Sequence, residues 1–177
     1  KTTMAKTRVR YFPVTDGYGN YKGLVSRRNY INARKKQLIL VDHNERTQSV
    51  DGVENAEILE IIDHHRIANI ETMNPVYFRN QPLGCTATII YQMYKEQNVK
   101  IDKPIAGLLC AAILSDTLAF KSPTCTFIDE AAAKELARLA EIDIYEFAME
   151  MFDAGSNLKD KTMDEILHQD FKKFDIG

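Results

Sequence analysis

Two apolar runs that each end in an acid followed by a histidine constrain the fold of this chain more than any other feature. The first is QLILVDHN, residues 37–44, and the second is AEILEIIDHH, residues 56–65. Continuous apolar runs of this length predict strands that are buried on both faces of a parallel sheet. The stretch NPVYFRN, residues 74–80, predicts a third and shorter strand.

Helical patterns dominate after the third strand. The segment after Pro104 is almost entirely apolar, which predicts a buried helix, and the Ala-rich repeat after the first-turn acid Asp129 predicts an amphipathic one. Strands followed by helices predict an α/β fold, with a mostly parallel sheet and helices on both faces. The predicted helices span residues 85–97, 103–117, 128–141, 143–155 and 162–170.

Residues 1–34 have a different pattern from the rest of the chain. A short apolar strand at residues 11–14 is followed by a glycine-rich turn at residues 16–20, a second strand around Leu24 and Val25, and a short helical stretch. Two strands and one short helix cannot bury much apolar surface. We therefore expect this segment to pack against the rest of the chain or against residues outside it.

The composition argues against several classes of partner. With 23 basic and 25 acidic residues the formal net charge is −2, and the longest basic runs, residues 27–28 and 34–36, are short, so we expect neither a nucleic-acid nor a membrane partner. Cys85, Cys110 and Cys125 form no CxxC pair, which predicts free thiols in a reducing compartment. The sequence also contains no signal peptide and no apolar run of membrane-spanning length, so we expect a cytoplasmic protein.

The two ends of the sequence suggest that it is part of a longer protein. Position 1 is Lys and not Met, and the final residues KKFDIG have the pattern of a strand that is just beginning. We therefore expect further residues on both sides.

The polar residues that end the two apolar runs are candidates for a metal site. The first run ends in Asp42-His43-Asn44 and the second in Asp63-His64-His65. Ligands in open α/β sheets bind at the carboxyl ends of the strands, so neighbouring strands would bring both groups to one edge. A third acid, Asp116, ends the apolar segment that starts at Pro104, where a buried carboxylate needs a partner.

Asp42, His64 and Asp116 together would form a mixed oxygen and nitrogen site. Such a set suits Mn²⁺, Fe²⁺, Co²⁺ or Zn²⁺ and leaves positions open for water or substrate. A single Asp-His pair at a strand end is more often a capped or solvated turn, but two such pairs and a further acid favour a metal site. The residues predict a metal-dependent enzyme of the hydrolytic kind without naming its substrate.

The motifs of this sequence resemble those of a known family. Asp63-His64-His65 is the motif that gives the DHH phosphoesterase superfamily its name. The order LVDHNE, IDHHRIAN, GCTATIIYQMYKE, AAILSDTLAFKSPTCT and AAAKELA is similar to that of the manganese-dependent (family II) inorganic pyrophosphatases, from about residue 37 to the end. The steps from Asp42 to His64 and from His64 to Asp116 fit the spacing in that family.

This resemblance implies a role for each site residue. Asp42 would bridge two Mn²⁺ ions, with Co²⁺ or Mg²⁺ as other candidates, and His64 and Asp116 would bind one of the ions. His65 would be a catalytic residue that faces the phosphate and holds or protonates it. Asp63 and Asn44 would orient the ligands.

The reaction that the resemblance implies is the hydrolysis of pyrophosphate to two phosphates by water activated between the metal ions. Family members are commonly homodimers. The family's N-terminal His-xx-Pro-Asp-x-Asp segment, which supplies further metal ligands, is not in this sequence, and its C-terminal substrate-binding domain would begin after residue 177. We therefore expect residues 35–177 to be an incomplete DHH domain with little or no activity by itself.

Residues 1–34 resemble the last part of a CBS (cystathionine β-synthase-like) domain. The resemblance lies in YFPVTDGYGNYKGLVSRRNY, residues 11–30, and some family II pyrophosphatases carry a pair of CBS domains just before the strand with the DHN motif. It implies regulation by adenine nucleotides, with Ser26 and Asn29 as candidate nucleotide-binding residues. Asn29 stands where an acidic ribose-binding residue is common.

Two other functions remain open at this point. One is a DHH phosphodiesterase that acts on short or cyclic nucleotides, although the DHN and SDTLAFKSPTCT motifs favour a pyrophosphatase. The other is a nucleotide-sensing CBS module that carries a vestigial DHH domain. A comparison of the hydrolysis of pyrophosphate with that of a dinucleotide distinguishes a pyrophosphatase from the phosphodiesterase. Binding of adenine nucleotide without binding of Mn²⁺ would favour the nucleotide-sensing module.

Overall fold

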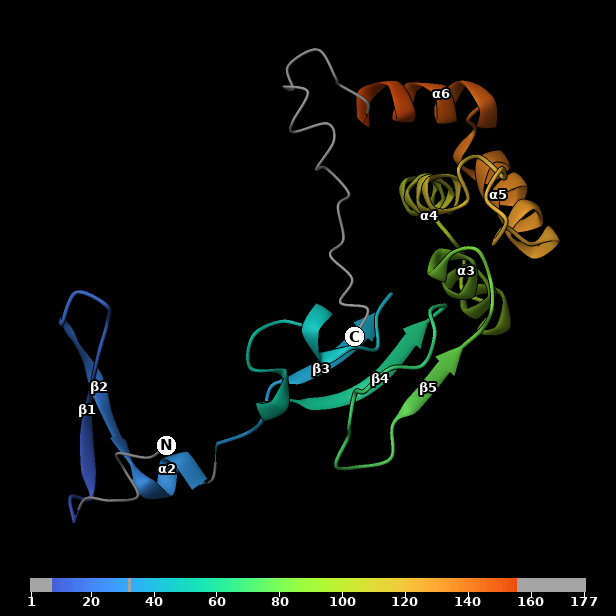
Figure 1. Cartoon of the computed structure of the whole chain (residues 1–177). Coiled ribbons are helices and arrows are strands. Elements are labelled where there is room, and N and C mark those ends of the chain that lie inside the picture. Colours follow the sequence, from blue (N-terminus) through green and yellow to red (C-terminus); the bar gives the residue numbers. More distant parts are fainter. Residues whose placement is uncertain (1–7, 32, 156–177) are drawn as a thin grey trace, which may run out of the picture.

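A computed structural model gives the fold of residues 8–31 and 33–155 of this chain. This part contains an antiparallel hairpin, a three-stranded parallel sheet and a stack of α-helices (Figure 1). The prediction of an α/β fold with a mostly parallel sheet flanked by helices is confirmed. The helix predicted at residues 162–170 lies outside the described residues.

The N-terminal segment, residues 8–31, is a hairpin followed by a short helix. Strands β1 (Tyr11–Thr15) and β2 (Tyr21–Ser26) pair antiparallel, and α2 (Arg27–Ile31) follows directly. In the turn, the side chain of Asp16 accepts hydrogen bonds from two backbone N–H groups, and Gly19 adopts a φ of 84° that favours glycine. The predicted pair of strands and short helix are thus present.

The sheet has the strand order β3-β4-β5, and both pairings are parallel. Two short 3₁₀ helices, η1 and η2, lie in the connection from β3 to β4, so this connection contains no α-helix. The bounds are β3 (Gln37–Val41), η1 (Arg46–Gln48), η2 (Val53–Asn55), β4 (Glu57–Asp63) and β5 (Tyr77–Asn80).

The prediction that the first apolar run is buried on both faces is wrong for β3. This strand lies at the edge of the sheet, where Leu40 is buried but Ile39 and Val41 are exposed to 54% and 44%. Helix α3 packs on the central strand β4 instead of on β3. Burial was also predicted for the second apolar run, and it is observed for the last residues of β4, from Ile61 to Asp63.

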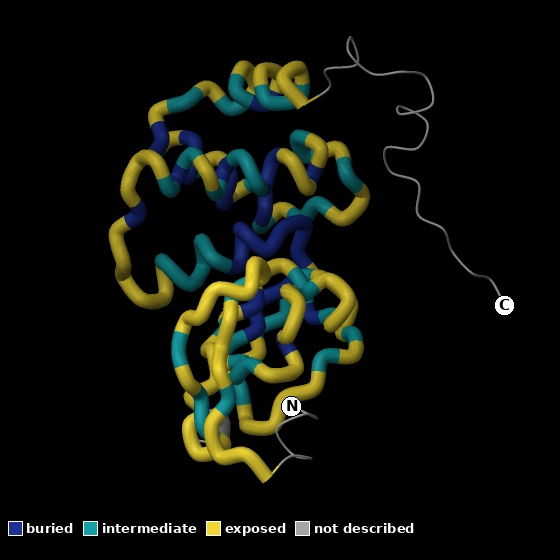
Figure 2. The backbone as a smooth tube through the Cα atoms, turned by 90° about the vertical axis from the view of Figure 1, so that its left-hand side faces the viewer, coloured by how far each residue is buried: buried dark blue, intermediate teal, exposed yellow. Residues whose placement is uncertain are grey.

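Four α-helices form a stack beside the sheet (Figures 1 and 2). Their main core is the contact between α4 and α5, whose buried side chains include Ile113 and Leu136. The prediction of a fully buried α4 is only partly right, because Leu108 is exposed. None of the described helices is long and apolar enough to cross a membrane. The bounds are α3 (Thr86–Glu96), α4 (Lys103–Asp116), α5 (Phe127–Ala140) and α6 (Ile144–Gly155).

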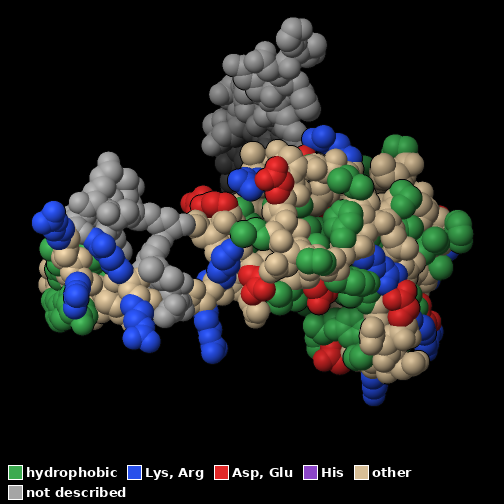
Figure 3. Space-filling view, turned by 90° about the horizontal axis from the view of Figure 1, so that it is seen from below, with side chains coloured by type: hydrophobic (Ala, Val, Ile, Leu, Met, Phe, Trp, Pro, Cys, Tyr) green, Lys and Arg blue, Asp and Glu red, His purple; other side chains and the backbone are tan. Residues whose placement is uncertain are grey.

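Charge is divided unevenly along the chain. Residues 1–36 contain ten Lys and Arg but a single acid, whereas residues 37–177 contain 13 Lys and Arg and 24 acids. Figure 3 shows Lys and Arg side chains around the N-terminal segment, while the larger part of the molecule carries both signs. The overall net charge of −2 therefore conceals two parts of opposite sign.

Candidate metal centre

Two parallel strands deliver polar side chains to one edge of the sheet. Asp42 follows β3 directly, Asp63 is the last residue of β4, and the two strands are neighbours. The backbone N–H of Asp42 donates to the carbonyl oxygen of Ile62 at 2.9 Å, which extends the pairing one residue past β3. The predicted meeting of the two strand ends is confirmed.

His64 lies beside Asp42 and is oriented by the backbone. Its Nε2 atom is 3.5 Å from Oδ1 of Asp42, and its Nδ1 atom is 2.9 Å from the carbonyl oxygen of Leu83. Because a carbonyl only accepts hydrogen bonds, Nδ1 carries a hydrogen, so in the neutral ring Nε2 is the nitrogen with the free lone pair. Metal-binding histidines are commonly held in this way, with the second ring nitrogen bonded to a carbonyl or a carboxylate.

His65 joins the same cluster. Its Nδ1 atom lies 2.8 Å from Oδ1 of the buried Asp63, so Nε2 of this half-exposed ring is the nitrogen that does not bond to Asp63. One possible ligand atom from each of Asp42, His64 and His65 lies within 4.8 Å of the others. The structure therefore groups two predicted ligands with the histidine that the sequence predicted to face phosphate.

Asp63 and Asn44 form a buried polar pair beneath the histidines. The amide of Asn44 donates to Asp63 and, at 3.0 Å, to the carbonyl oxygen of Arg66. Oδ1 of Asp63 also accepts from the backbone N–H groups of both histidines, at 2.8 and 3.2 Å. Burial would raise the pKa of Asp63, but hydrogen bonds from His65, from Asn44 and from the backbone outweigh it and hold this pKa below its usual value. Asp63 is therefore an ionised anchor for the His65 ring.

Asp116 lies at the C-terminal end of α4, and its carboxylate is exposed and not buried as the sequence suggested. Burial raises the pKa of Cys85, the residue before α3, and the neighbouring Asp116 carboxylate and the charge of Asp42 raise it further. Both predicted acidic ligands, Asp42 and Asp116, therefore raise the pKa of the same thiol.

All three cysteines are free, as predicted.

The chain turns sharply after Asp116. Leu118, Ala119 and Phe120 have φ values of 49°, 50° and 69°, so three consecutive non-glycine residues are left-handed. Such residues are uncommon singly and rarer in a run. The turn belongs to the SDTLAFKSPTCT motif, residues 115–126, and leads into α5.

Two contacts of the site were not predicted from the sequence. The hydroxyl of Thr86 donates to Oδ1 of Asp42 at 2.8 Å, and the carbonyl oxygen of Leu83 orients His64. Thr86 belongs to the GCTAT segment that opens α3, and Leu83 directly precedes this segment. The glycine and the threonines of this segment were the available signal, since a helix start so rich in small polar residues is suited to side-chain bonding.

Three predicted or neighbouring polar residues are engaged elsewhere. Nδ1 of His43 lies 3.0 Å from the carbonyl oxygen of Val41, and His43 is not in the cluster. Ser26 and Asn29 bond to each other at the start of α2, where Asn29 accepts from the Ser26 backbone N–H at 3.0 Å and donates its own N–H to the Ser26 hydroxyl at 3.1 Å. Helix capping accounts for this pair.

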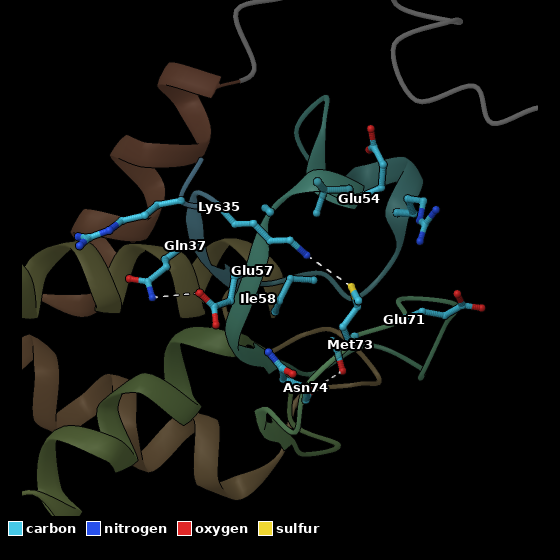
Figure 4. A pocket seen from close by; sticks show the side chains of 13 residues that line it. Lys35, Gln37, Glu54, Glu57, Ile58, Glu71, Met73 and Asn74 are labelled. Carbon is cyan, nitrogen blue, oxygen red and sulfur yellow. Dashed lines mark hydrogen bonds between the residues drawn. The ribbon is translucent and has the colours of Figure 1, made fainter. Parts of the chain in front are cut away.

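A cavity of about 700 Å³ lies at the opposite end of the sheet (Figure 4). It is lined by residues at the starts of β3 and β4, among them Gln37 and Glu57, which are hydrogen-bonded at 3.2 Å. Lys35 reaches across to the sulfur of Met73. No predicted site residue lines this cavity, and its mixture of basic and acidic side chains favours no class of ligand.

Comparisons with known proteins agree on one family. The profile of the DHH family, N-terminal domain, matches residues 4–113. The chain is 52% identical over 176 residues to a cobalt-dependent inorganic pyrophosphatase of Clostridium perfringens, a match that covers 99% of this chain and 32% of that protein. It is 57% identical over 140 residues to a manganese-dependent inorganic pyrophosphatase of Bacillus subtilis, which covers 79% of this chain and 45% of that protein.

The fold agrees with the sequence match. A solved structure from Methanococcus jannaschii, assigned to the family II inorganic pyrophosphatases, superposes with a TM-score of 0.70 at 41% identity. The superposition covers 81% of this chain and 50% of that one. This chain thus spans between about a third and a half of the length of these proteins.

Proposed function

Because this chain belongs to the DHH family, we propose that it forms part of the metal centre of an inorganic pyrophosphatase that uses Mn²⁺ or Co²⁺. The observation that carries the proposal is the cluster of Asp42, His64 and His65, with possible ligand atoms within 4.8 Å of one another. The names of the relatives, which include a manganese-dependent and a cobalt-dependent pyrophosphatase, support the substrate and the choice of metal.

The donor atoms of the site fit such an ion. Asp42 and Asp116 would supply carboxylate oxygens and His64 would supply Nε2, a set that suits Mn²⁺ and Co²⁺ and is compatible with Mg²⁺. The hydrogen bond from Nδ1 of His64 to the Leu83 carbonyl fixes the tautomer that ligation requires. When bound, the metal would neutralise phosphate charge and lower the pKa of water.

His65 and Asp63 would act on the phosphate itself. The ionised Asp63 holds Nδ1 of His65, so Nε2 is the atom that can bond to or protonate a phosphoryl oxygen. Asn44 would keep Asp63 in position from below.

The division of the chain into two parts is also proposed. Residues 1–34 would be the end of a CBS domain and residues 35–177 a DHH domain whose remaining parts lie elsewhere in a longer protein. The Clostridium perfringens match covers 99% of this chain, so it includes the N-terminal segment, whereas the Bacillus subtilis match covers 79%. Adenine-nucleotide binding near Ser26 and Asn29, a homodimer and a cytoplasmic location remain predictions.

The test is metal-dependent phosphate release by the full-length protein that contains this chain. With Mn²⁺ or Co²⁺ we expect pyrophosphate to be hydrolysed and linear or cyclic dinucleotides to be spared. His64→Asn should lower kcat/KM by at least about 100-fold, beyond the usual effect of residues that only support a ligand. His43→Asn, at the same edge but outside the cluster, is the matched control and should stay near wild type. Preferential hydrolysis of a dinucleotide would refute the proposal.

A second experiment separates the roles of the two neighbouring histidines. If His65 acts on phosphate, His65→Asn lowers kcat by about 10²- to 10⁴-fold while the Mn²⁺ dissociation constant, measured by calorimetry, stays unchanged. If His65→Asn lost as much Mn²⁺ affinity as His64→Asn does, His65 would instead be a metal ligand. The 177-residue chain by itself should release little phosphate.

A further inference from the structure

Residues 83–89, which we call the support segment, link the metal centre to the helices. They are the only seven consecutive buried residues in the part of the chain that the structure describes, and Figure 2 shows this buried stretch between the sheet and the helical stack. The carbonyl oxygen of Leu83 accepts from His64 at 2.9 Å, and the hydroxyl of Thr86 donates to Asp42 at 2.8 Å. The orientation of both side chains therefore depends on the support segment.

The support segment is held in turn by a single carboxylate, that of Asp129. Asp129 is fully buried near the start of α5, 45 residues after Gly84 in the chain. Its Oδ2 atom accepts the backbone N–H of Gly84 at 2.9 Å, and its Oδ1 atom accepts the hydroxyl of Thr88 at 2.6 Å. It also accepts the N–H and the hydroxyl of Thr126, at 2.8 and 2.6 Å. A capping box requires only the bond from the Thr126 N–H, together with the bond from the Asp129 N–H to the Thr126 hydroxyl.

The packing around Gly84 extends this connection to Asp116. A Cβ atom at Gly84 would lie 2.8 Å from Cγ2 of Thr117, closer than such atoms approach, and 3.0 Å from Oδ2 of Asp129, which is a tight contact. Thr117 is fully buried and directly follows Asp116. The end of α4 is therefore packed against the support segment at the point where Asp129 bonds to it.

We propose that Asp129 is a positioning residue of the metal centre, which fixes the support segment and through it the relative placement of Asp42, His64 and Asp116. The inference rests on the proposed function. The connection runs to His64 through Leu83, to Asp42 through Thr86, and to Asp116 through the contact between Gly84 and Thr117. A purely structural role for Asp129, as the cap of α5, would leave metal affinity unchanged in every folded variant.

The test compares two carboxylates at helix starts in the full-length protein. Asp129→Asn removes the charge and one acceptor, and it should raise the Mn²⁺ dissociation constant by about 10- to 100-fold. Asp102→Asn is the matched control, because exposed Asp102 caps α4 through the N–H of Ile105 at 3.1 Å without touching the support segment. This control should bind Mn²⁺ as the wild type does. Calorimetric titration with Mn²⁺ gives both constants, and kcat of the Asp129 variant should recover at saturating Mn²⁺.

A folded Asp129→Asn protein with the wild-type Mn²⁺ dissociation constant overturns the inference. If that variant does not fold, Thr88→Val and Thr88→Ser provide the comparison, since only Ser keeps the hydroxyl that bonds to Asp129. The inference expects weaker Mn²⁺ binding in Thr88→Val alone, and equal binding in the two variants contradicts it. A wild-type protein that bound neither Mn²⁺ nor Co²⁺ would overturn the proposed function itself, and this inference with it.

Discussion

The N-terminal segment and the body of this chain, residues 33–155, are stabilised in different ways. The body has a continuous core in which side chains such as Ile113 and Leu136 are fully buried. In the N-terminal segment, none of the side chains described, at residues 8–29, is buried. Hairpins of two strands are marginally stable in water at best. The comparison teaches that the body has its own core, whereas the N-terminal segment is held by the backbone pairing of β1 with β2 and has no buried side chain among residues 8–29.

The largest expected effect comes from removing a core side chain on one side of this comparison. Ile113→Ala should lower the free energy of unfolding by about 2–5 kcal/mol, because it leaves a cavity at a fully buried position between α4 and α5. Leu24→Ala in β2 is the control in the N-terminal segment, where Leu24 is 63% exposed, and should change this free energy by no more than about 0.5 kcal/mol. Urea unfolding followed by circular dichroism measures both. Equal losses would show that the hairpin shares the core of the body.

A smaller loss of unfolding free energy is expected when the pH is lowered, and this loss should also affect the body. Burial would raise the pKa of Asp129, but hydrogen bonds from Thr126, Thr88 and the Gly84 N–H hold it below its ordinary value of 3.8. The ionised carboxylate therefore stabilises the fold at neutral pH, and this contribution is lost as the pH falls below about 4 towards the lowered pKa.

We therefore expect the wild type and Asp129→Asn to differ most in unfolding free energy above pH 4 and to converge below it. The control is Asp16→Asn in the N-terminal turn, where hydrogen bonds from Asn20 also hold the pKa of the acid below its usual value. Because Asp16 lies in the exposed hairpin, this change should leave the unfolding of the body unaffected at every pH. If the difference in unfolding free energy between wild type and Asp129→Asn were constant from pH 7 to pH 3, the ionised Asp129 carboxylate would not be the source of the stabilisation.

The smallest effect is expected at the turn of the hairpin. Gly19→Ala places a Cβ atom at a φ of 84° and should destabilise the turn by about 1 kcal/mol. Gly17→Ala is the control, since Gly17 has no positive φ and no atom near its would-be Cβ. Faster amide exchange at Asn20 and Gly19, with unchanged exchange in α4, would measure the local effect. Faster exchange throughout the body would mean that the two regions unfold together.

The strand ends of the candidate site were predictable, because period and polarity are local properties of the sequence. The runs before Asp42 and Asp63 identify parallel strands, and parallel neighbours bring their carboxyl ends together. The exposure of Ile39 in β3 was not predictable, since burial depends on which element covers a face. The exposure of Asp116 was missed for the same reason: an apolar helix can still end at the surface.

The role of Asp129 was the hardest to predict. From the sequence it is a first-turn acid of an amphipathic helix, and this is correct. Nothing local indicates that its carboxylate also bonds to Gly84, which lies 45 residues earlier. Contacts of this kind depend on how α3 and α5 pack, which periodicity does not determine.

The left-handed turn of Leu118, Ala119 and Phe120 has a consequence for adaptation to heat. L-residues in this conformation cost roughly 1–2 kcal/mol each. The turn persists because Ala119 donates its N–H to the carbonyl of Leu114 in α4 and Ser122 donates its N–H to the carbonyl of Thr117, the residue after α4, at 2.8 Å each. Glycine at these positions would remove the steric conflict and would also loosen the chain beside Asp116. A change to glycine in this turn would therefore exchange backbone strain for flexibility beside Asp116, and these two effects on thermal stability oppose each other.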